Sequence, residues 1–197
     1  MIRADCDADV LTLTLDRPDR ANSLTAAMLS ALIGHVRDAT DLRLLILTGT
    51  GAKVFSAGAD LEEARAGLAT SPLWEDLSSA IAALPCLTVA ALNGTLAGGA
   101  FGMALACDIR LSVPQATFFY PVARLGYLPQ PSDPARMARL IGPARTKLIL
   151  AGGARLDASE ALAFGLIDRI TPDPMAAAHD LAAGEAAHIA AIKGMVP

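Results

Sequence analysis

Strand-like and helix-like patterns alternate along most of this 197-residue chain. Residues 10–15 alternate apolar and polar side chains, which is typical of a half-buried strand. Apolar residues then recur every four positions from Leu24 to Val36, as they do in an amphipathic helix. Residues 42–48 and 88–92 are short apolar runs typical of buried strands, and helical patterns follow them. This order predicts an α/β fold with largely parallel strand pairing.

Composition excludes several classes of protein. Hydrophobic residues make up 53% of the chain and charged residues 18%, so the chain has enough apolar surface to fold around a core. The net charge is −4 and aromatic residues make up 4%, which disfavours a nucleic-acid partner. Small-molecule chemistry or protein contact remains.

One apolar stretch is long enough to raise the question of a membrane span. Residues 87–107 form 21 consecutive positions without a charge. Their first part, however, is typical of a strand closed by the Asn93–Gly94 turn, and a glycine-rich corner and a short buried helix follow. We therefore predict no membrane association.

The remaining signals favour a cytoplasmic protein without a metal site. The first residues are acidic and contain no apolar signal core. The three cysteines are odd in number and have no metal-ligand spacing, so we expect reduced thiols, with Cys86 and Cys107 buried. No linker or repeat divides the chain, and we predict a core domain over residues 1–173 followed by an alanine-rich helical tail over 174–197.

Two corners rich in small residues are the candidate site. Residues 57–60 follow one predicted strand and residues 93–100 follow another, each ahead of a helix. Backbone N–H groups at a helix N-terminus favour negative charge, and two such donors aimed at one point would form an oxyanion hole. The alternative is that these glycines only permit tight turns. Neither corner has the spacing of a phosphate-binding loop, a dinucleotide turn or a nucleophile elbow.

Five segments together resemble the crotonase superfamily, the enoyl-CoA hydratase/isomerase family. They occur in the order and spacing of that family over nearly the whole chain: LDRPDRANSL (15–24), VFSAGADL (54–61), NGTLAGGAFGMALACDIRLS (93–112), LGYLPQ (125–130) and LDASEALAFGLIDRI (156–170). The resemblance implies a spiral of ββα units and chemistry on acyl-CoA thioesters. It also implies a homotrimer or a hexamer, with no tightly bound cofactor and with coenzyme A as part of the substrate.

The resemblance also assigns site residues. It implies that the amides of Ala59 and Gly99 form the oxyanion hole around the thioester carbonyl. The residues expected to line the substrate site around them are Ala21, Ala57, Gly58, Asp60, Gly98 and Val122. The basic residues considered for the coenzyme A phosphates are Arg17, Arg20 and Lys53.

The chain departs from the family at its two hydratase glutamates. Gly102 stands where the first glutamate would lie, and Val122 stands where the second would lie. Neither residue can transfer a proton. Glu62 and Glu63 are close in sequence, but the helix that starts after Asp60 is expected to point them at solvent.

The loop over residues 125–133 holds the remaining polar candidates. Other branches of the family place an acid, a base or a hydrogen-bonding residue directly after a proline of this loop. In this chain Gln130 holds that position, and its side chain forms hydrogen bonds but is not a base. Tyr127 and Asp133 are further catalytic candidates, with Tyr120 and Arg124 also nearby. The alternative is a structural role for each, and Asp133 before Pro134 has the pattern of a helix N-cap.

The family usually continues with C-terminal helices beyond residue 193, which this sequence lacks. A short natural protein, a shortened chain and a disordered continuation would each explain their absence. Our first hypothesis is an acyl-CoA-processing lyase or isomerase, of the kind found in fatty acid metabolism, that is not an efficient hydratase. The alternatives are a CoA-thioester decarboxylase, isomerase or hydrolase, or a non-catalytic acyl-CoA-binding or assembly subunit.

Overall fold

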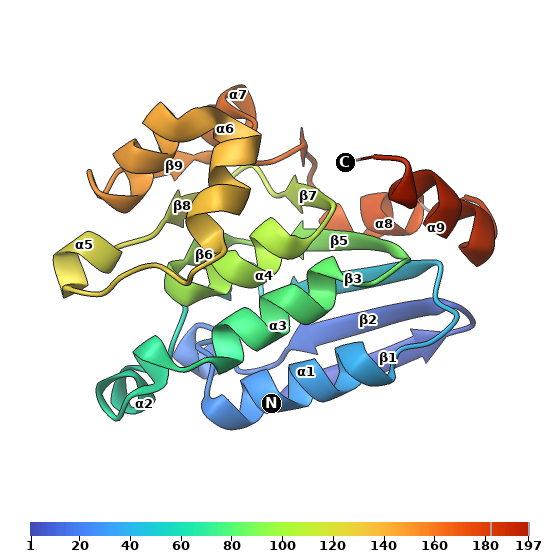
Figure 1. The fold of residues 1–197 in the computed structure, drawn as a ribbon, viewed down its shortest axis with the longest axis horizontal. Helices are drawn as coiled ribbons and strands as arrows, with labels where there is room; N and C mark the ends of the chain where they lie inside the picture. The colour runs from blue at the N-terminus through green and yellow to red at the C-terminus, as the bar shows by residue number, and fades with distance from the viewer. Residues whose placement is uncertain (182, 197) are drawn as a thin grey trace.

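The computed structural model describes residues 1–181 and 183–196. Strands and helices alternate along the chain, and the strands form two sheets (Figure 1). The larger sheet has the order β1-β2-β3-β5-β7-β10, with β1 antiparallel to β2 and the other pairs parallel. Its strands are β1 (Ile2–Asp7), β2 (Val10–Leu15), β3 (Leu44–Gly49), β5 (Leu87–Leu92), β7 (Ile109–Ser112) and β10 (Arg169–Ile170). The predicted α/β class and largely parallel pairing are confirmed.

The smaller sheet has the order β4-β6-β8-β9 and carries the candidate site. Its first three strands are parallel, and β9 runs antiparallel to β8. These strands are β4 (Val54–Ser56), β6 (Thr95–Ala97), β8 (Thr117–Phe119) and β9 (Arg155–Asp157). The chain alternates between the two sheets, from β3 to β4, from β5 to β6 and from β7 to β8. This repetition stacks similar units side by side, as the predicted spiral requires.

Helices cover both faces of the larger sheet. The α-helices are α1 (Ala26–Asp38), α2 (Leu61–Arg65), α3 (Leu73–Ala82), α4 (Phe101–Ala106), α5 (Val122–Leu125), α6 (Asp133–Leu150), α7 (Ala158–Phe164), α8 (Pro174–His179) and α9 (Ala186–Gly194). Short 3-10 helices are η1 (Pro18–Arg20), η2 (Leu68–Thr70) and η3 (Gly98–Ala100). Leu45 and Leu47 of β3 belong to the main core with α1, α3 and α4, whereas Leu44 and Ile46 belong to a second core with Ala178 of α8. Alternate side chains of β3 therefore point to opposite faces of the sheet, and each face packs against its own core.

Local sequence signals explain where the helices begin and bend. The Thr25 side chain accepts a hydrogen bond from the Met28 amide at the start of α1, as an N-cap residue does. Helix α6 contains a kink at Gly142, where φ is +80°, and Pro143 follows. Helical segments on either side of Gly142 therefore make up α6.

The tail beyond residue 173 is helical, as predicted, although residues 182 and 197 of that range lie outside the described residues. Helix α8 packs on the larger sheet, and α9 buries no residue completely. Within the described part of the chain, no helix has the length and apolar character needed to cross a membrane. All three cysteines are free, and Cys86 and Cys107 are buried as expected.

Candidate functional site: two converging backbone corners

The two glycine-rich corners meet at one edge of the smaller sheet. Strands β4 and β6 are parallel neighbours, so the segments that leave their carboxyl ends start side by side. Gly58 has φ +91° and Gly98 has φ +57°, left-handed values that favour glycine. A Cβ built on Gly58 would lie 3.0 Å from the Ala97 carbonyl oxygen and 3.3 Å from the Gly99 nitrogen. Only glycine lets the two corners approach this closely.

Hydrogen bonds fix the direction of the Ala59 amide. The Leu24 amide donates to the Gly58 carbonyl and the Asp60 amide donates to the Leu24 carbonyl, each at 2.8 Å. This parallel bridge uses the groups on either side of Ala59 and leaves its own N–H directed away from Leu24. That N–H has no hydrogen-bond acceptor among the described residues.

The Gly99 amide has no acceptor in the part of the chain that the structure describes, because it lies at the start of a helix. Gly99 lies in the first turn of η3, where backbone N–H groups have no partner within the helix. Both predicted oxyanion-hole donors therefore lie on adjacent corners without using their N–H groups inside the fold. Two N–H groups without described acceptors on neighbouring corners are the first requirement for a pair of oxyanion donors.

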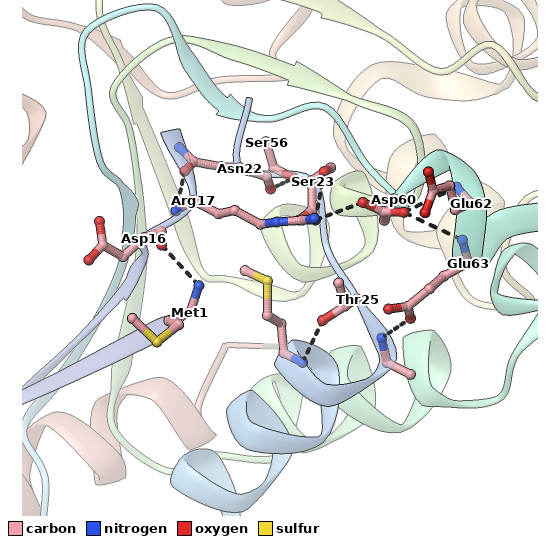
Figure 2. Close-up of polar contacts among 12 residues, drawn as sticks. Met1, Asp16, Arg17, Asn22, Ser23, Thr25, Ser56, Asp60, Glu62 and Glu63 are labelled. Carbon is pink, nitrogen blue, oxygen red and sulfur yellow. Dashed lines mark hydrogen bonds and ion pairs between the residues drawn. The ribbon is translucent and has the colours of Figure 1, made fainter. Parts of the chain in front are cut away.

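Hydrogen bonds of the buried side chains of Ser56 and Asn22 hold the first corner in place (Figure 2). The Ser56 hydroxyl donates to the Asn22 carbonyl at 2.8 Å and accepts from the Gly58 amide at 3.2 Å. The Asn22 side chain donates to the carbonyls of Thr50 and Val54 at 3.0 and 2.9 Å. Ser56 and Asn22 were not among the predicted site residues. The small polar residues before the glycine corner were the available signal.

An ion pair holds the start of α2 against the loop that follows β2. Arg17 Nη1 lies 2.7 Å from Asp60 Oδ2, and it also donates to the carbonyl and hydroxyl of Ser23 at 3.2 Å (Figure 2). Asp60 Oδ1 accepts from the Glu62 and Glu63 amides and so caps α2. The hydrogen bond from Arg17 and these amides hold the pKa of Asp60 below its usual value, against the opposing effect of burial.

The basic candidates for phosphate binding occupy different environments. A surface cleft beside the first corner is lined by Arg17, Arg20, Ala21 and Asp60, together with Ala57 and Ala59. Arg17 is already paired with Asp60, whereas Arg20 is exposed at the cleft. Lys53 is not among the residues lining this cleft, and its carbonyl accepts a hydrogen bond from the Thr95 amide. Of the three, Arg20 is best placed to meet an anion.

An apolar pocket of about 120 Å³ shares Ala57 and Ala59 with this cleft. Its lining includes three of the predicted substrate-site residues, which are Ala57, Gly98 and Val122, and both predicted donors, Ala59 and Gly99. The ring of Trp74 packs against Gly99, where an added Cβ would lie 3.2 Å from the ring. Its indole N–H donates to the Leu68 carbonyl at 2.7 Å, which fixes the ring as a wall of the pocket. Trp74 was not among the predicted site residues, although it is the one tryptophan of the chain.

The loop candidates divide between the pocket wall and its rim. Gln130 lines the wall, is buried, and donates to the Ala69 carbonyl at 3.3 Å. Tyr127 lies at the rim with 36% of its surface exposed. Exposed apolar side chains continue the rim at Leu61, Leu125 and Leu128. The pocket wall and rim are therefore suited to an apolar acyl group.

Asp133 occupies a different environment from the one its sequence predicts. The N-cap of α6 is Ser132, so the N-cap interpretation of Asp133 was wrong. Asp133 is the first helical residue, its side chain is fully buried, and Tyr120 Oη donates to its Oδ2 at 2.9 Å. The other carboxyl oxygen, Oδ1, has no described partner and lies 3.1 Å from the point where a Cβ on Gly102 would stand.

Burial dominates the titration of this pair. It raises the pKa of Asp133 to about 6, opposed by the hydrogen bond from Tyr120 and the charge of Arg136. Burial also raises the pKa of Tyr120, and the negative charge of Asp133 raises it further. The Asp133 carboxyl group, from α6, therefore lies beside Gly102, close to where a glutamate side chain at position 102 would begin.

The expectation that Glu62 and Glu63 both face solvent is wrong for Glu63. Glu62 is exposed, but Glu63 Oε2 accepts a hydrogen bond from the Ala26 amide at 2.7 Å (Figure 2). The first turn of α1 has unpaired amides, and the Glu63 carboxylate satisfies one of them. Glu63 therefore links α2 to α1 and does not face the pocket.

Comparison with known proteins identifies the family. The family model described as "Enoyl-CoA hydratase/isomerase" matches residues 5–195. The chain belongs to the enoyl-CoA hydratase/isomerase family. This result confirms the resemblance from the five sequence segments.

Relatives within the enoyl-CoA hydratase/isomerase family are longer than this chain. YngF of Bacillus subtilis is 38% identical over 187 residues, an alignment that covers 89% of this chain and 72% of YngF. Carnitinyl-CoA dehydratase of Citrobacter koseri is 37% identical over 168 residues, covering 82% of this chain and 64% of the dehydratase. The chain thus spans less than two thirds of the length of that dehydratase.

Solved structures of the enoyl-CoA hydratase/isomerase family confirm the crotonase fold. DspI of Pseudomonas aeruginosa superposes with a TM-score of 0.90 at 29% identity, covering 99% of this chain and 85% of DspI. An enoyl-CoA hydratase from Bacillus anthracis superposes with a TM-score of 0.88 at 30% identity, covering 99% of this chain and 81% of that protein. The predicted fold is therefore correct over almost the entire chain.

Proposed function

We propose that this chain processes acyl-CoA thioesters as a lyase or isomerase, using the Ala59 and Gly99 amides to stabilise an enolate oxygen. The observation that carries the proposal is the contact between the two corners, with the Gly99 nitrogen 3.3 Å from a Cβ position on Gly58. Two preorganised N–H donors polarise a thioester carbonyl and make the adjacent α-proton acidic. A group that moves protons then determines the reaction.

The site supports reactions other than efficient hydration. Hydration of an enoyl-CoA needs a group that positions and deprotonates water at the β-carbon. Gly102 has no side chain, and Val122 lines the pocket with an apolar one. Because Trp74 and Val122 keep this wall apolar, the site favours proton transfer on the acyl chain over the positioning of water.

Coenzyme A enters this proposal as part of the substrate. The cleft on the Arg20 side of Ala59 accommodates the polar part of the molecule, and the pocket on the Trp74 side accommodates the acyl group. Ala57 and Ala59 line both, so the thioester lies between them. No tightly bound cofactor is required for enolate chemistry of this kind.

We also propose a cytoplasmic homotrimer or hexamer. The exposed apolar side chains at the pocket rim include Leu61, at 74% exposure, and Leu128, at 84%. Ile192 and Met195 expose a second apolar surface on α9 and its end. Contact with further copies would cover such surfaces. A monomeric sedimentation profile across micromolar concentrations would contradict this part of the proposal.

The function is tested by binding and turnover with a panel of CoA thioesters. The panel contains a trans-2-enoyl-CoA, a trans-3-enoyl-CoA, a saturated acyl-CoA, a carboxyacyl-CoA and carnitinyl-CoA. Acyl-CoA should raise the melting temperature by mass action, and ADP should raise it less. Binding with isomerase or lyase turnover supports the enzyme, whereas binding without turnover of any member indicates an acyl-CoA-binding subunit. No binding by any thioester would contradict the proposal.

A further inference from the structure

We propose that Tyr120 and Asp133 form the proton-transfer pair of this site, with Tyr120 contacting the substrate and Asp133 acting through the tyrosine hydroxyl. This inference rests on the proposed function, because the proton concerned is the one made acidic by the Ala59 and Gly99 amides. It adds a group that the sequence lacks at positions 102 and 122.

Tyr120 is held rigidly at the pocket. It lies just beyond β8 and is among the residues that line the pocket. Its ring stacks on Phe101 with centroids 5.3 Å apart and an interplanar angle of 16°. Its hydroxyl donates to Asp133 Oδ2 at 2.9 Å. The ring therefore has one fixed direction, and the hydroxyl has a defined proton acceptor.

Asp133 is placed by the absence of a side chain at Gly102. Its Oδ1 atom is 3.1 Å from the Cβ position of Gly102, so any side chain there would press on the carboxyl group. Oδ1 is buried and has no described hydrogen-bond partner, which is costly for a structural carboxylate. A role as proton acceptor explains why Oδ1 is kept without a described partner better than a structural role does.

The surrounding charges leave the pair able to gain and lose a proton. The charged groups near Asp133 are Glu75 on α3 and Arg136 on α6, which have opposite charges, and Tyr120 donates its hydrogen bond to the carboxyl group. Glu75 is engaged by the Ser132 amide and hydroxyl, so it does not hydrogen-bond Asp133. Because burial sets the pKa of Asp133 at about 6, its carboxylate is present at neutral pH yet far more basic than an exposed one.

The proton-transfer step balances without any additional reactant. The Tyr120 oxygen takes a proton from the α-carbon while its own proton passes to Asp133 Oδ2. The electron pair of the broken C–H bond forms the enolate, whose negative charge rests on the thioester oxygen at the two backbone amides. Return of the proton by the same route, to the α-carbon or to the γ-carbon of an unsaturated chain, gives exchange or double-bond migration.

Hydrogen–deuterium exchange at the α-carbon of butyryl-CoA in D₂O tests this step directly, because a saturated chain undergoes no further reaction. Tyr120→Phe and Asp133→Asn should each lower the exchange rate by about 10²-fold or more. Wild-type exchange should fall tenfold per pH unit below about pH 6 as Asp133 becomes protonated. Asp173→Asn, a carboxyl-to-amide change at the exposed N-cap of α8, is the matched control and should exchange like the wild type.

A second variant guards against a purely structural effect of the substitutions. Asp133→Ala combined with Gly102→Glu supplies a carboxyl group from α4 in the space that Asp133 vacates. This double variant should exchange at least tenfold faster than Asp133→Ala alone, with near-ultraviolet circular dichroism confirming that each variant is folded.

Calorimetric binding of butyryl-CoA separates the two proposals. Failure of the wild type to bind overturns the proposed function and this inference with it. Binding without exchange, or exchange that persists within threefold in folded Tyr120→Phe and Asp133→Asn variants, overturns the proton-transfer pair and leaves the oxyanion hole standing. Binding that persists in both variants, with exchange lost, is the result we expect.

Discussion

Gly58 and Gly99 approach so closely that a Cβ on Gly58 would lie 3.3 Å from the Gly99 nitrogen. The same Cβ would lie 3.0 Å from the Ala97 carbonyl oxygen. This contact joins two segments separated by about forty residues, which hold Ala59 and Gly99 just beyond the carboxyl ends of β4 and β6. The function proposed for the chain depends on it.

Gly58→Ala should therefore damage the site more than its size suggests. The residue has φ +91°, which is strained for alanine, and the methyl group would push the corners apart. We expect a loss of more than about 1 kcal/mol in unfolding free energy and a loss of about 10²-fold in turnover. Gly34→Ala in α1 is the control: a Cβ there meets nothing within 4 Å, so the change should stabilise the protein. Equal turnover in the two variants would contradict a tight corner-to-corner geometry.

Asp133→Asn should stabilise the protein at neutral pH while it removes proton transfer. The pKa of Asp133 is raised from its usual 3.8 to about 6, so the native state holds this proton more strongly than the unfolded state. The stability that the protonated carboxyl group contributes to the native state is fully present below pH 3.8 and is lost as pH rises to about 6. The stability gain from Asn should thus be larger at pH 8 than at pH 4, by up to about 3 kcal/mol. Urea unfolding at both pH values measures this, and parallel curves would show that the carboxyl group titrates normally.

Hydration of a short trans-2-enoyl-CoA should be slow. Acid–base groups contribute about 10²–10⁴-fold, and Gly102 and Val122 supply none. Adding glutamates at both positions should raise hydration only when Asp133 is also changed to Ala, because its carboxyl group occupies the space beside Gly102. Comparing Gly102→Glu/Val122→Glu with and without Asp133→Ala measures this effect. Robust wild-type hydration would mean that another residue positions the water.

Much of the fold was predictable because it depends on local patterns. The period of two in β2 and the four-residue spacing in α1 each specify an element by themselves. The corners at Ala57–Asp60 and Gly98–Gly99 were also visible, since small residues after strands are typical of close backbone approach. Local sequence patterns were sufficient to predict these features.

The side chains that complete the site were harder to predict because they come from distant segments. Asp133 was a catalytic candidate from its place in the loop, with a helix cap before Pro134 as the alternative, and nothing local relates it to Gly102, thirty-one positions earlier. Glu63 was expected to face solvent because a helix starts after Asp60, yet it pairs with the first turn of α1. Trp74 contacts Gly99 through tertiary packing alone. Side-chain direction at such positions is set by the packing of whole elements.

The three thiols should differ in reactivity with a thiol reagent under native conditions. Burial raises the pKa of Cys107 to about 12 and raises that of Cys86, which leaves little thiolate in either. Cys6 is exposed on β1. Mass spectrometry after labelling should find a single modified site at Cys6, with the other two labelled only after unfolding. Fast native labelling of Cys107 would contradict the packing of α4 against the sheet.

The infrared C=O stretch of a ¹³C-carbonyl acyl-CoA bound to the protein reports on the oxyanion hole itself. Two amide donors aimed at the thioester oxygen weaken the C=O bond, so we expect a band at lower frequency when bound than when free. Gly58→Ala, which separates the donors, should return the band toward its free position. A bound thioester whose carbonyl frequency equals that of free acyl-CoA would contradict an oxyanion hole at Ala59 and Gly99.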